Sequence, residues 1–187
     1  RAYAYGLELL VKKTAGRIRG WVGYTYAETN RHIKKHGWYQ PKYDRTHTLN
    51  MVGDLEILDG LHFSTSLQAA SGQPFTPPVG RYDQWYAQHG AFGHYWTYNP
   101  GFLVDDKNSA RLSPYFRLDI GLKQNKTFYG LPYQRFFQLV NVTNHINPLT
   151  HQYRNKTNRL TGETLGLERA EVPMFPFFFT MGFRIEF

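Results

Sequence analysis

Hydrophobic and polar residues alternate over most of this chain with a period of two residues, which is the period of a β-strand. The clearest run is the last one, where an aromatic or aliphatic side chain occupies every second position from Phe175 to Phe187. A helical period is almost absent. The alternation predicts an all-β protein with about seven strands, at residues 2–11, 17–26, 44–57, 61–70, 116–123, 134–144 and 175–187.

The connections between these runs alternate in length. Tight turns are predicted near Ala15, Asp59 and Gly130, because each lies in a short segment rich in turn-forming residues. The other connections are long loops and cover residues 28–43, 73–114 and 145–174. Strands of about 10–14 residues exceed the usual 5–6 of soluble proteins and match those that cross a bilayer. Short turns at one end and long loops at the other are the layout of bacterial outer-membrane barrels.

Each predicted strand also has a polar face. The charged residues on the polar faces of these strands are Arg17, Arg19, Asp54, Glu56, Arg117, Asp119, Lys123, Arg184 and Glu186. A soluble sandwich or barrel would bury the apolar face, whereas a membrane barrel turns that face to lipid and encloses a polar lumen. Strand length, loop asymmetry and an interfacial cluster of aromatic residues favour the antiparallel transmembrane β-barrel, with the soluble fold as the alternative. The predicted aromatic belt consists of Trp21, Tyr24, Tyr26, Trp38 and Tyr39.

Composition narrows the classes of protein further. The 187 residues include no Cys, which excludes a disulfide scaffold, a cysteine zinc site and a thiol nucleophile. No apolar run reaches the length of about 20 residues that a transmembrane helix needs. The chain has 14 Tyr, 14 Phe and 4 Trp, which argues against intrinsic disorder. Its net charge of +8 would suit nucleic acid, a phosphate-rich membrane surface or an anionic ligand.

Four short segments stand at the ends of predicted strands. They read YDRTHTLN at 43–50, SGQPFTP at 71–77, RLSPYFRLD at 111–119 and NVTNHINP at 141–148. In their order and spacing they resemble the C-terminal part of a TonB-dependent outer-membrane receptor, and the resemblance covers nearly the whole chain. It departs at Ser113, where Pro is common, and at Phe116, where His is common. The terminal Phe187 is similar to the aromatic residue that serves as the membrane-insertion signal of such barrels.

The resemblance implies an integral protein of the bacterial outer membrane. Receptors of this family import scarce ligands, such as ferric siderophores, cobalamin or glycans, and TonB supplies the energy. The complete barrel has about 22 strands around a plug, so this chain is expected to be the last seven or so. The plug, the earlier strands and the segment that contacts TonB are then expected on another part of the same protein or on another chain. A non-transporting barrel segment that acts as a structural or surface-binding module is the alternative.

The connection 73–114 contains the candidate ligand site. Its aromatic and cationic residues could stack on and pair with an aromatic or anionic ligand. They are Arg81, Tyr82, Trp85, Tyr86, His89, Tyr95, Trp96 and Tyr98. The alternative is a loop that packs on its own aromatic residues.

Other chemistry is not expected. His32 and His36 have the spacing of a helical metal pair but lie in a polar loop, and His89 and His94 are weighed only as a remote metal or haem contact, so no metal and no cofactor are predicted. No nucleophile elbow or carboxylate pair indicates an enzyme. Without a nucleic-acid motif, lipopolysaccharide phosphates are the more economical partner for the loop cations.

Overall fold

The computed structural model describes residues 1–90, 93–157, 160 and 164–185. Their regular elements are all β-strands, so the all-β prediction is confirmed, and every pairing between strands is antiparallel. Among these residues there is no helix of the length and apolarity that a membrane crossing requires. Phe187 and Glu186 lie outside the described residues, so the insertion signal stays a prediction.

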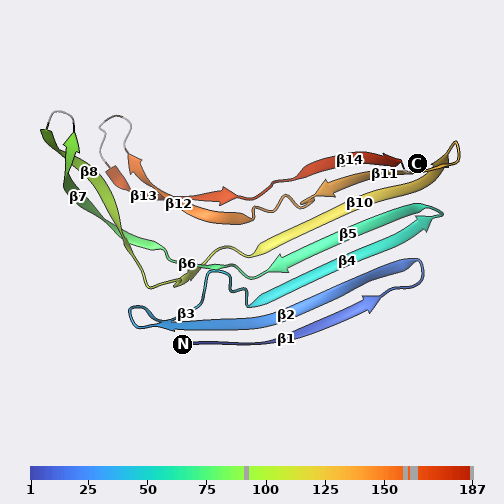
Figure 1. Cartoon of the computed structure of the whole chain (residues 1–187), viewed down its shortest axis with the longest axis horizontal. Coiled ribbons are helices and arrows are strands. Elements are labelled where there is room, and N and C mark those ends of the chain that lie inside the picture. The colour runs from blue at the N-terminus through green and yellow to red at the C-terminus, as the bar shows by residue number, and fades with distance from the viewer. Residues whose placement is uncertain (91–92, 158–159, 161–163, 186–187) are drawn as a thin grey trace.

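One large sheet contains the long strands in the order β1-β2-β4-β5-β10-β11-β14, and the short β3 pairs with β2 (Figure 1). The bounds are β1 Ala2–Lys13, β2 Ile18–Ile33, β3 Gly37–Tyr39, β4 His47–Leu58, β5 Leu61–Ala70, β10 Tyr115–Phe128, β11 Leu131–Val140 and β14 Phe178–Ile185. These strands coincide with the runs predicted from alternation, apart from shifted ends. The run expected at 134–144 lies in β11, which begins and ends earlier.

The connections are segregated as the alternation of their lengths predicts. The short turns β1–β2, β4–β5 and β10–β11 lie at one end of the sheet, and all the long connections lie at the other (Figure 1). Two of the long connections are not the open loops that the sequence suggested. They form β-hairpins that extend past the sheet, one from β7 (Pro78–Gly90) and β8 (Gly93–Val104), the other from β12 (Pro148–Thr157) and β13 (Thr164–Pro173). The short β6 (Pro74–Phe75) and β9 (Ala110–Arg111) pair at the base of the first hairpin.

Strand register places the apolar side of every long strand on the same face of the sheet. Directly paired residues of antiparallel strands share a face. Met51 pairs with Val22 on one side and with Leu67 on the other, and Leu67 pairs with Leu118. At the far edge Phe137 pairs with both Leu122 and Met181. The result is one continuous apolar face from β1 to β14.

This apolar face is exposed. Leu9 is 57% exposed, Met181 is 67% and Phe183 is 73%. In the described part of the chain Val140 is the only buried aliphatic or aromatic side chain apart from three prolines. The long strands pack extensively only on their neighbours within the sheet. The two-layer core that a soluble sandwich requires is therefore not formed by the described residues.

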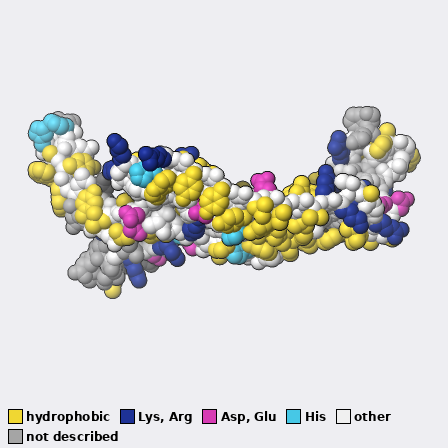
Figure 2. Space-filling model, turned by 90° about the horizontal axis from the view of Figure 1, so that it is seen from below, with side chains coloured by type: hydrophobic (Ala, Val, Ile, Leu, Met, Phe, Trp, Pro, Cys, Tyr) yellow, Lys and Arg dark blue, Asp and Glu magenta, His cyan; other side chains and the backbone are white. Residues whose placement is uncertain are grey.

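The space-filling view shows where these side chains gather. Seen edge-on, the molecule is curved, and hydrophobic side chains run along the middle of its convex side, while Lys and Arg gather toward the two ends (Figure 2). A band of this kind is what a curved sheet presents when its convex face meets a thin apolar layer.

The opposite face is polar, and several of its charged residues are paired. Arg19 and His62 both contact Oδ1 of Asp54, at 3.2 and 3.1 Å, across three neighbouring strands. Arg117 and Asp119 pair at 2.6 Å within β10. The contacts of Asp54 thus join neighbouring strands, and the pairs form small groups rather than one ladder across the sheet.

Register also corrects the predicted aromatic belt. Trp21 pairs with Lys12 and Val52 and lies on the polar face, as does Tyr39 by its pairing with Arg31. The aromatic group on the apolar face is instead Tyr3, Tyr5, Tyr24, Tyr26 and Trp38, near the end with the long connections. Within it the rings of Tyr3 and Trp38 are 5.3 Å apart. Of the five residues predicted for the belt, Tyr24, Tyr26 and Trp38 thus share the apolar face, and the membrane interface itself stays a prediction.

The sheet does not close on itself. In the described residues β1 pairs only with β2, and β14 pairs only with β11. Both outer edges therefore have backbone N–H and C=O groups that the sheet leaves unpaired.

Candidate functional site

The predicted ligand residues lie on the hairpin of β7 and β8. Its register sets Trp85 opposite Tyr98, Ala87 opposite Trp96 and Gln88 opposite Tyr95. Alternation therefore divides the eight residues between two faces of the hairpin. Arg81, Trp85, His89 and Trp96 share one face, and Tyr82, Tyr86 and Tyr95 share the other. Tyr98 is placed only by its pairing, since its side chain lies outside the described atoms.

The two hairpin faces differ in how their rings are held. A Cβ added at Gly101 would lie 2.3 Å from the Tyr82 ring, and one added at Gly90 would lie 2.8 Å from the Tyr95 ring. Each of these tyrosines thus packs over a glycine of the neighbouring strand, as the self-packing alternative anticipated. Trp85 and Trp96 are 62% and 71% exposed. The tyrosines Tyr82, Tyr86 and Tyr95 are 42–52% exposed, so the tryptophan face is the more open of the two to a ligand ring.

The four sequence motifs meet at the end of the sheet from which the hairpins extend. Arg111 donates to Asp44 at 2.7 Å, to the backbone carbonyl of Gly72 at 2.8 Å and to the side chain of Gln40. Asp44 also accepts the backbone N–H of Thr29 at 3.0 Å. One buried carboxylate and one guanidinium thus connect the entry of β4, the exit of β5 and the approach to β10.

The fourth motif is joined to the third by amide side chains. Asn147 both donates to and accepts from the backbone of Phe116, at 2.8 Å each, and so takes the position that a neighbouring strand would occupy. The buried backbone N–H of Asn141 donates to Asp119 at 2.9 Å. Asn141 and Asn144 have φ of 53° and 48°, a left-handed conformation that Asn tolerates better than most residues. These roles account for all four Asn and Asp positions in the third and fourth motifs.

Burial shows how closely the network is packed. The buried residues of the described chain are Pro41, Asp44, Gly72, Pro74, Asp119, Val140, Asn141, Asn147 and Pro148. All of them lie in the four motifs or within two residues of one. The buried part of the described chain is therefore a polar network at one end of the sheet rather than an apolar core. We call it the motif network.

Side chains of the connecting segments complete the rim. Asp105 accepts hydrogen bonds from the backbone of Asp106 and from the Ser109 hydroxyl, which hold its pKa below the usual value. On the second hairpin His151 packs edge-on to Phe75 with ring centroids 4.8 Å apart, and contacts Glu171 at 3.3 Å. The contact between His151 and Phe75 holds the hairpin of β12 and β13 against β6.

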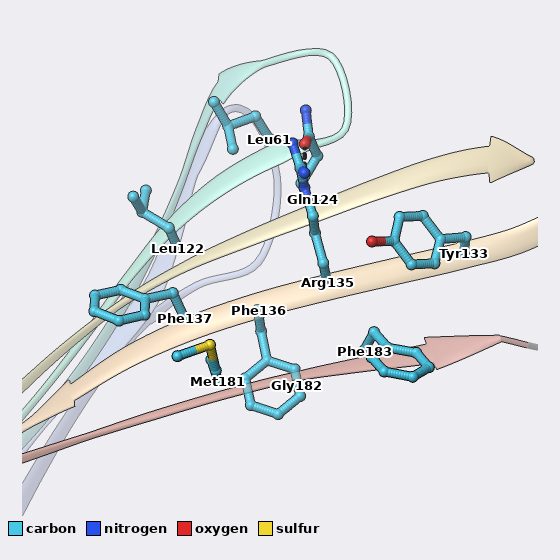
Figure 3. Close-up of a pocket in the computed structure, with 10 residues that line it drawn as sticks. All are labelled: Leu61, Leu122, Gln124, Tyr133, Arg135, Phe136, Phe137, Met181, Gly182 and Phe183. Atoms are coloured by element: carbon cyan, nitrogen blue, oxygen red, sulfur yellow. Dashed lines mark hydrogen bonds between the residues drawn. The ribbon is translucent and has the colours of Figure 1, made fainter.

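A groove of about 640 Å³ lies on the sheet at the opposite end, near the short turns (Figure 3). Leu61, Leu122, Phe137, Met181 and Phe183 contribute its apolar lining, and Arg135 hydrogen-bonds Gln124 at 2.8 Å at its margin. Phe136 points to the other face and its ring lies across Gly182, where an added Cβ would be 2.7 Å away. Phe137, and not Phe136, therefore faces the apolar side.

Comparison with protein-family models, with curated proteins and with solved structures finds no match for this chain. In the residues that the structure describes, no group of three or more His, Asp or Glu side chains is placed to hold a metal ion.

Sequence reasoning missed two features of the site. It did not pair Asp44 with Arg111, which belong to different motifs 67 residues apart. It also took residues 73–114 as a loop, so it could not set His89 opposite His94. A signal for the first was present, because the motifs at 43–50 and 111–119 each contain Asp and Arg residues that can pair with one another.

Proposed function

We propose that this chain forms part of the wall of a β-barrel in the bacterial outer membrane, and that the barrel belongs to a TonB-dependent receptor that imports a scarce ligand. The observation that carries the membrane placement is the continuous, exposed apolar face of β1 to β14. Exposed apolar patches on soluble monomers rarely exceed a few hundred Å². A face that spans seven paired strands needs an apolar surrounding, and a bilayer supplies one.

The two faces support the same arrangement. Lipid would contact the convex apolar face, and the paired charges of Arg19, Asp54, His62, Arg117 and Asp119 would line an aqueous interior. The ring cluster of Tyr3, Tyr5, Tyr24, Tyr26 and Trp38 would lie at one membrane interface. The hairpins then project beyond the membrane, where aromatic and cationic side chains can meet a ligand or lipopolysaccharide.

The open edges support a larger barrel. An unsatisfied backbone polar group in lipid costs several kcal/mol, so β1 and β14 require further strands. We propose that the rest of the barrel provides them, from the same chain or another one, and that a plug fills the lumen. The receptor assignment itself rests on the resemblance of the four motifs, whose residues contact one another in the motif network.

Growth of cells that express the full protein tests the transport assignment. The cells would be supplied with limiting iron chelate, cobalamin or glycan in strains with and without TonB. TonB-dependent growth on one of them supports the receptor. Correct insertion in the outer membrane without such growth would favour the alternative, a barrel that acts as a structural or surface-binding module.

A further inference from the structure

The tip of the β7–β8 hairpin brings two histidines together. His89 and His94 are direct partners in the strand register, and the centroids of their rings are 3.9 Å apart at an interplanar angle of 64°. Both residues are exposed. Imidazole pairs of this kind are suited to zinc, copper and nickel, which bind ring nitrogen at about 2.0–2.1 Å.

We propose that His89 and His94 form a two-histidine site for a divalent transition-metal ion at the tip of this hairpin. Two imidazole nitrogens that share one tetrahedral ion stand about 3.3 Å apart, which follows from that bond length. The two rings need only turn about their side-chain bonds to reach this spacing, because the paired backbones already hold them side by side. The remaining coordination positions are open to water or to donor atoms of a ligand.

The neighbouring residues on the histidine face are small or exposed. The next register pair on that face is Ala87 with Trp96, and Ala87 is exposed and has only a methyl side chain. Trp96 lies two positions from His94 on the same strand and therefore on the same face, and it is 71% exposed. An ion held here would stand beside the open tryptophan face of the hairpin.

The chemistry of the site predicts a selectivity. Neutral imidazole is a borderline donor, so affinity follows the order of stability for first-row metals, with Cu²⁺ bound more tightly than Ni²⁺ or Zn²⁺ and much more tightly than Mn²⁺. Mg²⁺ and Ca²⁺, which prefer oxygen donors, bind negligibly. The proposal is independent of transport, since the site would exist on a receptor and on a non-transporting barrel alike.

Titration of the complete, tag-free protein in detergent micelles with Cu²⁺ and Zn²⁺ tests the proposal. The variants are His89→Ala, His94→Ala, their combination, and His36→Ala as a matched control that removes another exposed histidine. We expect each single variant at the hairpin to weaken Cu²⁺ binding at least tenfold. The double variant should be little weaker than either single variant, because one imidazole does not chelate. His36→Ala should bind as the unchanged protein does.

A spectroscopic readout separates chelation from a structural role. Electron paramagnetic resonance of the bound Cu²⁺ should show hyperfine coupling to two ring nitrogens, and His94→Phe, which keeps an aromatic ring, should abolish that signal. The proposal is overturned if each single variant changes affinity less than threefold, if His36→Ala weakens binding equally, or if the spectrum shows coupling to a single nitrogen.

Discussion

The carboxylate of Asp44 accepts a hydrogen bond of 2.7 Å from the guanidinium of Arg111, which lies 67 residues later in the chain. The Asp44 side chain is 1% exposed, whereas that of Arg111 is 31% exposed. A buried carboxylate is tolerated only when it is paired and hydrogen-bonded. This pair therefore fixes the entry of β4 against the segment that leads into β10, and the hairpin of β7 and β8 extends from the same place.

Removal of the guanidinium should destabilise the protein strongly. Arg111→Ala leaves the charge of Asp44 buried without its partner, and we expect a loss of about 3 kcal/mol in the free energy of unfolding. Urea unfolding of the protein in vesicles measures it. The matched control is Arg154→Ala, because both side chains of the Arg154–Glu168 pair are exposed and solvent screens their attraction, so its loss should be small. Equal losses in the two variants would contradict a buried ion pair.

The neutral variant Asp44→Asn provides a second arm of the same test. In the Arg111→Ala background it removes the buried charge while it keeps a side-chain oxygen for the N–H of Thr29. Stability should recover in part. Further loss on adding Asp44→Asn would mean that the charge of Asp44 is stabilised by groups other than Arg111.

Substitution of Gly72 by any other residue should destabilise the protein. A Cβ at this position would lie 1.7 Å from the backbone oxygen of Leu112, which cannot move aside without breaking the contact between β5 and the approach to β10. Gly72→Ala should therefore lose stability at or above the upper end of the usual range for overpacking, about 1–3 kcal/mol. Gly23→Ala is the control, since its Cβ would meet only the side chains of Trp21 at 3.4 Å and Leu10 at 3.6 Å, both ordinary contact distances, and it should be nearly neutral.

A charge introduced on the two faces of β5 should change the folding free energy by different amounts. Leu67 lies on the apolar face and Ser66, its neighbour, on the polar one. Leu67→Lys should cost about 2–4 kcal/mol in folding free energy in a bilayer, as a lysine near the midplane does, whereas Ser66→Lys should cost little. Folding titrations into lipid vesicles measure both. Comparable costs for the two substitutions would count against a lipid-facing side.

Ligand contact should depend on the tryptophan face of the hairpin. Trp85→Ala and Trp96→Ala should each weaken uptake of the ligand found in the growth assay about tenfold, since an aromatic contact is worth on the order of 1 kcal/mol beyond its buried area. Trp38→Ala, which removes an exposed Trp from the ring cluster instead, should leave affinity unchanged. An unchanged apparent affinity in both hairpin variants would assign these rings to the folding of the hairpin alone.

Strand alternation carried most of the information about the sheet. It set the long strands, their turns and the face to which residues such as Leu67 and Leu118 belong, because the side-chain period of a strand is two and does not depend on the partner. It left open which of Phe136 and Phe137 faces the apolar side, and strand register decides that. It was less reliable for the aromatic belt, where Trp21 was grouped by its proximity in sequence to Tyr24, although odd and even positions lie on opposite faces.

The hairpins and the motif network could not be derived in the same way. Residues 78–104 show no regular alternation, since Gly80, Pro100 and several polar residues interrupt it, and the pairing of His89 with His94 follows only from register. Asp44 and Arg111 meet through tertiary structure. The motifs indicated which residues lie at the strand ends, and the structure shows which of them contact one another.

Spin labels on single cysteines along β5 test the membrane placement most directly, and the 187 residues contain no cysteine that would interfere. Collision of each label with oxygen, which concentrates in lipid, is compared with collision with a water-soluble nickel chelate, for the complete protein in bilayers. If the apolar face meets lipid, oxygen access should be high at Phe63, Thr65, Leu67 and Ala69. Chelate access should be higher at Ser64, Ser66 and Gln68. Low access of both reagents at the first group, or no alternation between the groups, would contradict a lipid-facing sheet.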